Sequence, residues 1–406
     1  MTETPIGPTT DQIGSREEAE GFVAMVCFKH GPPRLHGVEL EWTVHHADDP
    51  HRPLDAAHLS SALGVYAPTT LVPDSPHRPL GRGSLVTVEP GGQVEISGPA
   101  AASVSQLIED TAADAAELTA LLAAADLIPG DHGLDPFRPP RRLLDVPRYA
   151  AMERAFERLG PHGPRMMCSS AGLQVCLDAG ETAQRWQALH DLGPTLLALF
   201  ANSSHREGAD TGWASARTEA TFGTCAPFTE PPPKPTDDPA ADWARTAMEA
   251  PVLCLRRGDS WDAPAGLTFG AWADGALPDD RPTYDDLDYH LSTLFPPVRP
   301  RGYLEVRYLD AQTGDGWIAP TVLLSALMSG PDVVDQALAA AEPAAGRWLP
   351  AARNGLADDL LRQAARQVVE VGTGAVDRLD IGKDLAIEVG DRLHYIVDDL
   401  NGRRAS

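Results

Sequence analysis

Several stretches of the chain alternate apolar and polar residues, the period of a β-strand with one face toward water. They are VELEWTV at 38–44, the strand–turn–strand of 84–89 and 93–97 around Pro90-Gly91-Gly92, the end of 165–178, and RGYLEVRYLD at 301–310. The glycines of the 90–92 turn supply the backbone angles that a return strand needs. In each strand the apolar side chains are expected to pack on a core.

Other stretches have the spacing of helices. They are the segment starting at Arg16, the Ala-rich segments 103–125, 147–159 and 182–201, and most of 318–400. Strands and helices follow one another without a regular β-α-β rhythm, which predicts an α+β fold with a mainly antiparallel sheet. We expect a loose tail at 1–16 and a single catalytic domain at 17–406, with a Pro-rich surface loop near 226–240.

Charge and composition limit the partners of this 406-residue chain. A formal net charge of -25 argues against a nucleic-acid partner, which needs clustered Lys and Arg. The longest apolar run, near 196–201, is too short to span a bilayer, so no membrane partner is expected. Five cysteines without metal-ligand spacing suit reduced thiols and a cytoplasmic location. The oligomeric state is left open between a monomer and a small homo-oligomer.

Acidic residues share the polar face of these strands. They are Glu39 and Glu41 in the first strand, Glu89 and Glu95 around the turn, and Glu305 in the last. Two carboxylates ~4 Å apart repel by roughly 4 kcal/mol at an effective dielectric near 20, so a crowded group needs counter-ions or protons. Mg²⁺, which prefers oxygen ligands and stays open to phosphates, is the natural answer. The alternative is that each pair is only a solvated strand face with surface ion pairs.

Nucleotide-binding motifs of the common kinds do not occur in the sequence. It contains neither G-x-x-x-x-G-K-[ST] nor a strand-bound G-x-G-x-x-G. Any ATP must therefore be held through metal ions and arginines. His45 and His46 lack further ligands at metal spacing and are expected at the surface.

The motifs together resemble the glutamate–cysteine ligase family of plants and many bacteria, and most closely its actinobacterial branch linked to ergothioneine synthesis. The resemblance covers about two-thirds of the chain, 37–312, and no motif was placed after it. It rests on GVELEWTV, EPGGQVEISG, MMCSSAGLQVCLD, FANSS followed by GWASAR, and DLDYHLSTLFPPVRPRGYLEVRYLDA. It implies an antiparallel sheet curved into a funnel with helices outside, as in glutamine synthetase.

The resemblance also implies a reaction, in which ATP phosphorylates the γ-carboxylate of glutamate and the amine of cysteine then displaces the phosphate. ATP is a co-substrate and Mg²⁺ the cofactor. The implied metal ligands are Glu39, Glu41, Glu89, Glu95 and Glu305, with Gln174 lining the same site. Arg307 would face the transferred phosphoryl group, making Arg307 and Glu305 the catalytic residues, while Arg217 and Arg299 or Arg301 would hold substrate carboxylates.

Some alternatives stay open at this point. A ligase of the same fold with another amine acceptor, or a binding protein with weak catalysis, would carry the same motifs. The sequence names no base for the amine and does not separate ergothioneine from glutathione as the end product. It does predict that Glu305→Ala loses far more activity than stability, because removing one acid from a crowd relieves repulsion.

Overall fold

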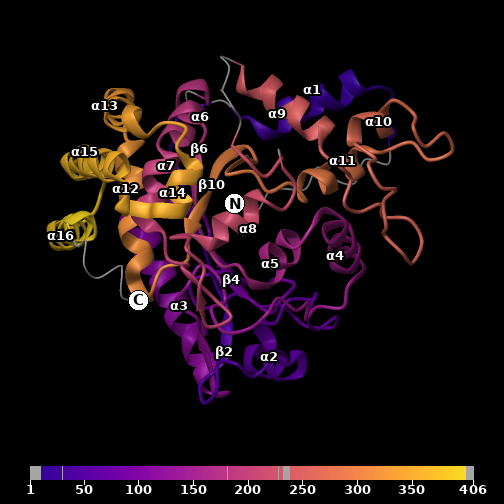
Figure 1. The fold of residues 1–406 in the computed structure, drawn as a ribbon, viewed down its shortest axis with the longest axis horizontal. Helices are drawn as coiled ribbons and strands as arrows, with labels where there is room; N and C mark the ends of the chain where they lie inside the picture. Colours follow the sequence, from indigo (N-terminus) through magenta and orange to yellow (C-terminus); the bar gives the residue numbers. More distant parts are fainter. Residues whose placement is uncertain (1–10, 30, 181, 227, 232–237, 399–406) are drawn as a thin grey trace.

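A six-stranded antiparallel sheet lies at the centre of the computed structural model, which describes residues 11–29, 31–180, 182–226, 228–231 and 238–398 (Figure 1). The strand order is β3-β4-β1-β6-β10-β9. The bounds are β1 His36–Trp42, β3 Leu85–Val88, β4 Val94–Ser97, β6 Gly172–Asp178, β9 Val298–Pro300 and β10 Tyr303–Asp310. The expected α+β class is confirmed, and the sheet ends at β3 and β9 without closing on itself.

The apolar side chains of the strands pack on helices that cover one face of the sheet. Buried residues such as Leu40, Ile96, Val175 and Val306 join one core that runs from Ile13 to Val397. Helices α3 (Val104–Ala123), α7 (Gly193–Phe200) and α12 (Ile318–Leu327) contact β1, β10 and β6. A core shared along most of the chain is what a single domain would have. The domain bounds 17–406 stay a prediction.

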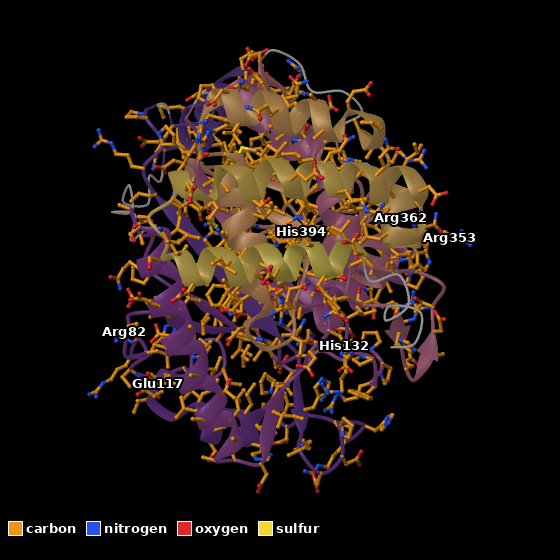
Figure 2. The ribbon with its side chains drawn as sticks, turned by 90° about the vertical axis from the view of Figure 1, so that its left-hand side faces the viewer. Arg82, Glu117, His132, Arg353, Arg362 and His394 are labelled. Atoms are coloured by element: carbon orange, nitrogen blue, oxygen red, sulfur yellow. The ribbon has the colours of Figure 1, made fainter. Side chains whose placement is uncertain are left out.

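Further helices build an outer layer beyond α12. They are α13 (Pro331–Ala341), α14 (Trp348–Asn354), α15 (Asp359–Ala375) and α16 (Lys383–Asp398). Figure 2 looks onto this layer, where α15 with Arg362 lies beside α16 with His394. Among the described residues no single helix is long and apolar enough to cross a membrane. One pair of helices, Gly314–Leu327 and Pro331–Ala344, is long and apolar enough when taken together, but it is bent by 113°.

The remaining elements lie around the other end of the sheet and along its edge (Figure 1). They are α1 (Arg16–Cys27), β2 (Val44–His46), α2 (Ala56–Leu63), β5 (Leu127–Pro129), α4 (Pro147–Leu159), α5 (His162–Ser169), α6 (Thr182–Asp191), β7 (His205–Arg206), β8 (Ala209–Asp210), α8 (Ala216–Phe222), α9 (Pro239–Glu249), α10 (Phe269–Ala273) and α11 (Tyr284–Leu291). The helix predicted at 147–159 has these same bounds.

Some sequence-based expectations were wrong. The single helix expected at 182–201 is two, α6 and α7, because Pro194 has no N–H to continue the ladder and its ring would clash with the preceding turn. His45 and His46 are buried on β2, not exposed. The tail is shorter than predicted, since Ile13 is completely buried, while 1–10 lie outside the described residues. So does most of the Pro-rich loop, before α9 begins at Pro239.

Candidate active site

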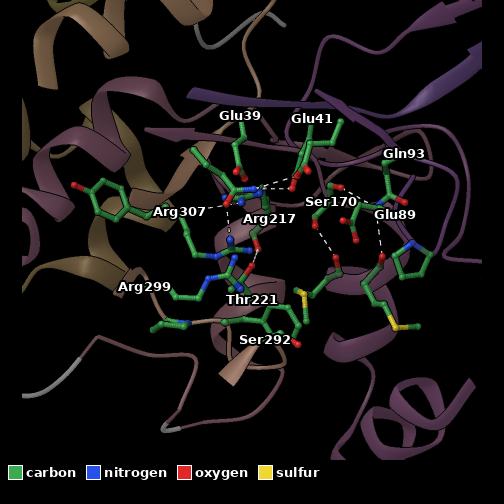
Figure 3. Close-up of a pocket in the computed structure, with 18 of the residues that line it drawn as sticks. Glu39, Glu41, Glu89, Gln93, Ser170, Arg217, Thr221, Ser292, Arg299 and Arg307 are labelled. Carbon is green, nitrogen blue, oxygen red and sulfur yellow. Dashed lines mark hydrogen bonds between the residues drawn. The ribbon is translucent and has the colours of Figure 1, made fainter. Parts of the chain in front are cut away.

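The polar face of the sheet borders a cavity of about 400 Å³ (Figure 3). Its charged lining consists of four glutamates and five arginines: Glu39, Glu41, Glu89, Glu95, Arg148, Arg217, Arg299, Arg301 and Arg307. Gln174 lines it as well. The structure therefore brings together every site residue predicted from sequence except Glu305, which lies beneath the lining.

The carboxylates come together because their strands are neighbours in register. Glu41 on β1 lies directly opposite Glu95 on β4, and Glu39 lies opposite Gln174 on β6. The Gln174 amide donates from Nε2 to Glu41 Oε1 at 3.0 Å and to Glu95 Oε2 at 3.4 Å. Glu41 also accepts the Gly172 N–H at 2.6 Å. Like charges placed opposite each other destabilise a sheet, so this arrangement is expected to serve a ligand.

Burial and the neighbouring acids raise the pKa values of Glu39, Glu89 and Glu95. Burial, reinforced by Glu305 and Glu41, raises the pKa of Glu39 from 4.5 to about 7. Burial and the charge of Glu41 raise the pKa of Glu89 to about 7, and burial together with Glu39 raises the pKa of Glu95 well above its ordinary value. A cluster that resists ionisation in the ligand-free protein is one that a divalent cation would stabilise.

Glu305 has a different environment from the other four acids. It is completely buried and accepts hydrogen bonds from Arg299, Nε to Oε2 at 3.1 Å and Nη2 to Oε1 at 2.8 Å, and another from Arg307. Burial alone would raise the pKa of Glu305, but these two arginines lower it to about 2. Its carboxylate is thus ionised at neutral pH, and the two guanidinium groups balance its charge. The geometry makes it the counter-ion of two arginines, which sequence periodicity did not reveal.

The arginines differ in how much of their hydrogen-bonding capacity is already used. Arg299 is held by Glu305, whereas Arg307 reaches both Glu305 and the Gln174 side-chain oxygen from the centre of the cavity. Arg301 lies just beyond β9 with an exposed side chain at the cavity edge. Of the two candidates in PPVRPRGY, Arg301 is therefore the more accessible to solvent.

Sequence reasoning missed Arg148, at the start of α4 on the opposite wall. Its guanidinium donates from Nη1 to Ser292 Oγ at 3.1 Å and from Nη2 to the Ser292 carbonyl at 3.0 Å, and lies 4.8 Å from the centre of the Tyr289 ring. The apolar side chains of Met152, Met167 and Phe295 line the cavity nearby. The residue pattern of a helix does not show which surface its first turn will face in the folded protein, so the position of Arg148 in the cavity wall could not be predicted.

The described residues contain no group of three or more His, Cys, Asp or Glu already gathered as metal ligands. The donors nevertheless suit Mg²⁺ in kind, because all are carboxylate oxygens on one face of the sheet, and burial beside other acids raises the pKa values of Glu39 and Glu89.

Comparison of the chain with known proteins shows the family to which it belongs. Residues 35–405 match the family model described as "Glutamate-cysteine ligase family 2 (GCS2)". The chain belongs to this family. It is 38% identical over 371 residues to "Glutamate--cysteine ligase EgtA" of Mycolicibacterium smegmatis, across 89% of this chain and 84% of that protein. The protein of the same name from Mycobacterium tuberculosis is 38% identical over 411 residues, covering 98% and 92% of the two chains.

More distant relatives include the chloroplastic glutamate–cysteine ligase of Arabidopsis thaliana, 29% identical over 319 residues, 72% of this chain and 60% of that one. A solved structure of glutamate–cysteine ligase from Francisella tularensis in complex with AMP covers 91% of this chain and 83% of its own, with 14% identity and a TM-score of 0.46. The family resemblance seen in the strands is thus confirmed, and the chain is a ligase of an ATP-dependent family.

Proposed function

We propose that this cavity forms γ-glutamylcysteine from glutamate, cysteine and ATP through a γ-glutamyl phosphate. One observation carries the proposal: four glutamates and five arginines from separate parts of the chain line the same cavity. A carboxylate is a poor electrophile, so ATP must first convert one of its oxygens into a good leaving group. The transfer requires cations around the phosphoryl oxygens and little other chemistry.

Mg²⁺ is assigned to the four lining carboxylates, Glu39, Glu41, Glu89 and Glu95. When bound, Mg²⁺ neutralises phosphate charge and aligns the oxygens of the nucleotide. Glu305, the fifth predicted ligand, is instead assigned to hold Arg307 and Arg299, since both its oxygens already accept their hydrogen bonds.

The arginines act on the substrates in this proposal. Arg307 faces the phosphoryl group in transfer, fixed between Glu305 and Gln174 so that little reorganisation is needed at the moment of reaction. Arg217 and Arg301 bind substrate carboxylates, for which the planar guanidinium is suited. The apolar side chains beside Arg148 limit the access of water to the acyl phosphate.

An assay of purified protein tests the proposal. With Mg·ATP, release of ADP should require glutamate, and γ-glutamylcysteine should form only when cysteine is added, as read by mass spectrometry. Glutamate labelled with ¹⁸O in the γ-carboxylate should pass one labelled oxygen to phosphate, because the acyl phosphate breaks at the carbonyl carbon. Unlabelled phosphate would contradict the intermediate, and equal rates with other amines would contradict cysteine as acceptor.

The pathway and location follow the branch that the sequence resembles. We propose that the product feeds ergothioneine synthesis in the cytoplasm, where the thiols of Cys27, Cys168, Cys176, Cys225 and Cys254, which form no disulfide within the described residues, stay reduced. Disruption of the gene should lower cellular ergothioneine, whereas a fall in glutathione alone would contradict this assignment.

A further inference from the structure

A buried aspartate stands behind the cavity, on the last residue of β10. Asp310 has no exposed surface. Its Oδ2 accepts hydrogen bonds from the Asn202 N–H at 2.8 Å and Ser203 Oγ at 2.7 Å, and its Oδ1 accepts one from Ser215 Oγ at 2.9 Å. Burial raises the pKa of Asp310, while Arg217 and these three donors lower it, so the donor set favours the ionised carboxylate against the cost of burial.

The same hydroxyl groups hold the cavity residue Arg217. Ser203 Oγ accepts the N–H of Arg217 at 3.1 Å, and Ser215 caps α8, where Arg217 is the second residue. The Arg217 guanidinium has Nη1 at 3.9 Å from Asp310 Oδ1 and donates from Nη2 to the Arg307 carbonyl at 3.0 Å. Asp310 and its donors thus fix both the backbone and the charged end of Arg217.

Arg217 is set to bind something that the protein itself does not supply. Only 8% of the residue is exposed, it lines the cavity, and within the described part of the chain its Nε, although buried, has no hydrogen-bond partner. Gly172 makes room for it, because a Cβ at that position would lie 2.4 Å from Arg217 Nη2. The buried guanidinium has an unused donor, and its Nη1 lies 3.9 Å from the Asp310 carboxylate, which is beyond hydrogen-bond distance. Such a group is suited to bind a second, incoming anion.

We propose that Asp310 is a positioning residue that, through Ser203 and Ser215, presets Arg217 to bind a carboxylate of glutamate. The inference rests on the proposed function for the identity of this ligand. Asp310 touches neither substrate nor reacting atoms; it fixes the guanidinium before the substrate arrives, so less entropy is lost on binding. The FANSS and GWASAR motifs thereby acquire a shared role, since they supply the three donors to Asp310 and the arginine it holds.

Asp310→Asn tests this role against a purely structural one. Its matched control is Asp286→Asn, which changes another buried aspartate that pairs with an arginine, Arg257 at 2.9 Å, and accepts a hydroxyl hydrogen bond, from Thr283 Oγ1 at 2.9 Å. Asp286 does not line the cavity. Glutamate binding is measured by calorimetry on the full chain, the KM values of the three substrates by assay, and Tm for both variants.

The expected result is a rise of roughly tenfold to a hundredfold in the Kd and KM of glutamate for Asp310→Asn, the range of a charge-assisted hydrogen bond. The KM of ATP should change by less than about twofold, and Asp286→Asn should lower Tm without changing the KM of glutamate. If Asp310→Asn does not fold, Ser203→Ala, which removes one of the donors, should show the same selective rise on a smaller scale.

The outcomes separate this inference from the proposed function. Unchanged glutamate affinity in a folded Asp310→Asn, or equal changes in all three KM values, would overturn the positioning role alone. Wild-type protein that binds glutamate but never releases ADP would overturn the proposed function, while a selective loss of glutamate binding in Asp310→Asn would still support the positioning role. Wild-type protein that does not bind glutamate would overturn both.

Discussion

Arg299 and Glu305 face each other across β9 and β10 and form a bidentate pair at 3.1 Å and 2.8 Å. Arg307 joins the same carboxylate from its own strand. The pair is buried, with side-chain exposures of 10% and 0%. It follows that Arg307 and Arg299, which both line the cavity, share one buried counter-ion in Glu305.

Glu305→Ala should therefore lose stability as well as activity. Strand periodicity alone predicts a loss of activity with little loss of stability. The structure changes the prediction for stability, because removal of Glu305 leaves two buried guanidinium groups without their counter-ion. We expect a loss of roughly 3–5 kcal/mol in the free energy of unfolding, measured with urea. Glu153→Ala, which breaks the partly exposed pair with Arg142, should lose less than about 1 kcal/mol. Similar losses in the two variants would contradict the assigned role.

Glu39→Gln, in contrast, should gain stability while it loses activity. Glutamine keeps the shape of the side chain and removes a charge that burial and neighbouring acids disfavour. The ligand-free variant should gain roughly 1–3 kcal/mol at about pH 8, while kcat/KM should fall roughly a hundredfold or more through loss of a metal ligand. Glu157→Gln, on the exposed face of α4, is the control and should change neither quantity. A stable and fully active Glu39→Gln would remove Glu39 from the metal site.

Glu39 and Glu89 should lower the stability of the ligand-free protein as pH rises, while the buried His45, His190 and His290, whose pKa values burial lowers to about 4, act in the opposite direction below about pH 6.5. In the folded protein both glutamates have a pKa of about 7 instead of 4.5, so between these values the folded state holds protons that the unfolded state has lost. Each pH unit in this window removes up to about 1.4 kcal/mol per group.

Melting temperatures from about pH 5 to about pH 7.5 measure this slope. Saturating Mg²⁺ should remove the contribution of the glutamates to this slope, because a bound cation favours the ionised carboxylates. Glu39→Gln should reduce that contribution by about a third, since one of the three glutamates with raised pKa values, Glu39, Glu89 and Glu95, is gone. A slope that Mg²⁺ leaves unchanged would argue against metal binding by these carboxylates.

Arg148→Met should weaken the binding of an anionic substrate. The charge of Arg148 lies in the cavity wall, fixed by Ser292, and methionine retains much of the apolar stem. We expect a rise of about tenfold or more in the KM of ATP or of glutamate, and the substrate affected identifies the anion bound at this wall. Arg154→Met, on the same helix and paired with Asp262 outside the cavity, should leave both KM values unchanged.

The acid face could be predicted because it depends on local periodicity. Within one strand, Glu39 and Glu41 must share a face, and an apolar partner face fixes which side is buried. The pairing of Glu305 with Arg299 could not be predicted in the same way. It depends on β9, a strand of three residues ending in proline, which has no alternation to detect.

Two other residues escaped sequence analysis for physical reasons. Arg148 belongs to a helix whose placement depends on tertiary packing. Asp310 would share the apolar face with Leu304 and Val306 if alternation continued, but the pairing of β10 with β6 shifts by one residue between Val306 and Leu309. Asp310 then lies opposite Gly172, on the same side as the acids.

That shift gives a single strand two different phases. Before it, odd-numbered positions of β10 carry the charged groups; after it, an even-numbered position does. A regular ladder over the same residues would place Leu309 opposite Gly172 in the position of Asp310, with hydrocarbon against the Arg217 guanidinium and a carboxylate among the core helices. The irregularity is therefore as important for the site as the chemical identity of residue 310, because it decides which of two neighbouring side chains meets the Arg217 guanidinium.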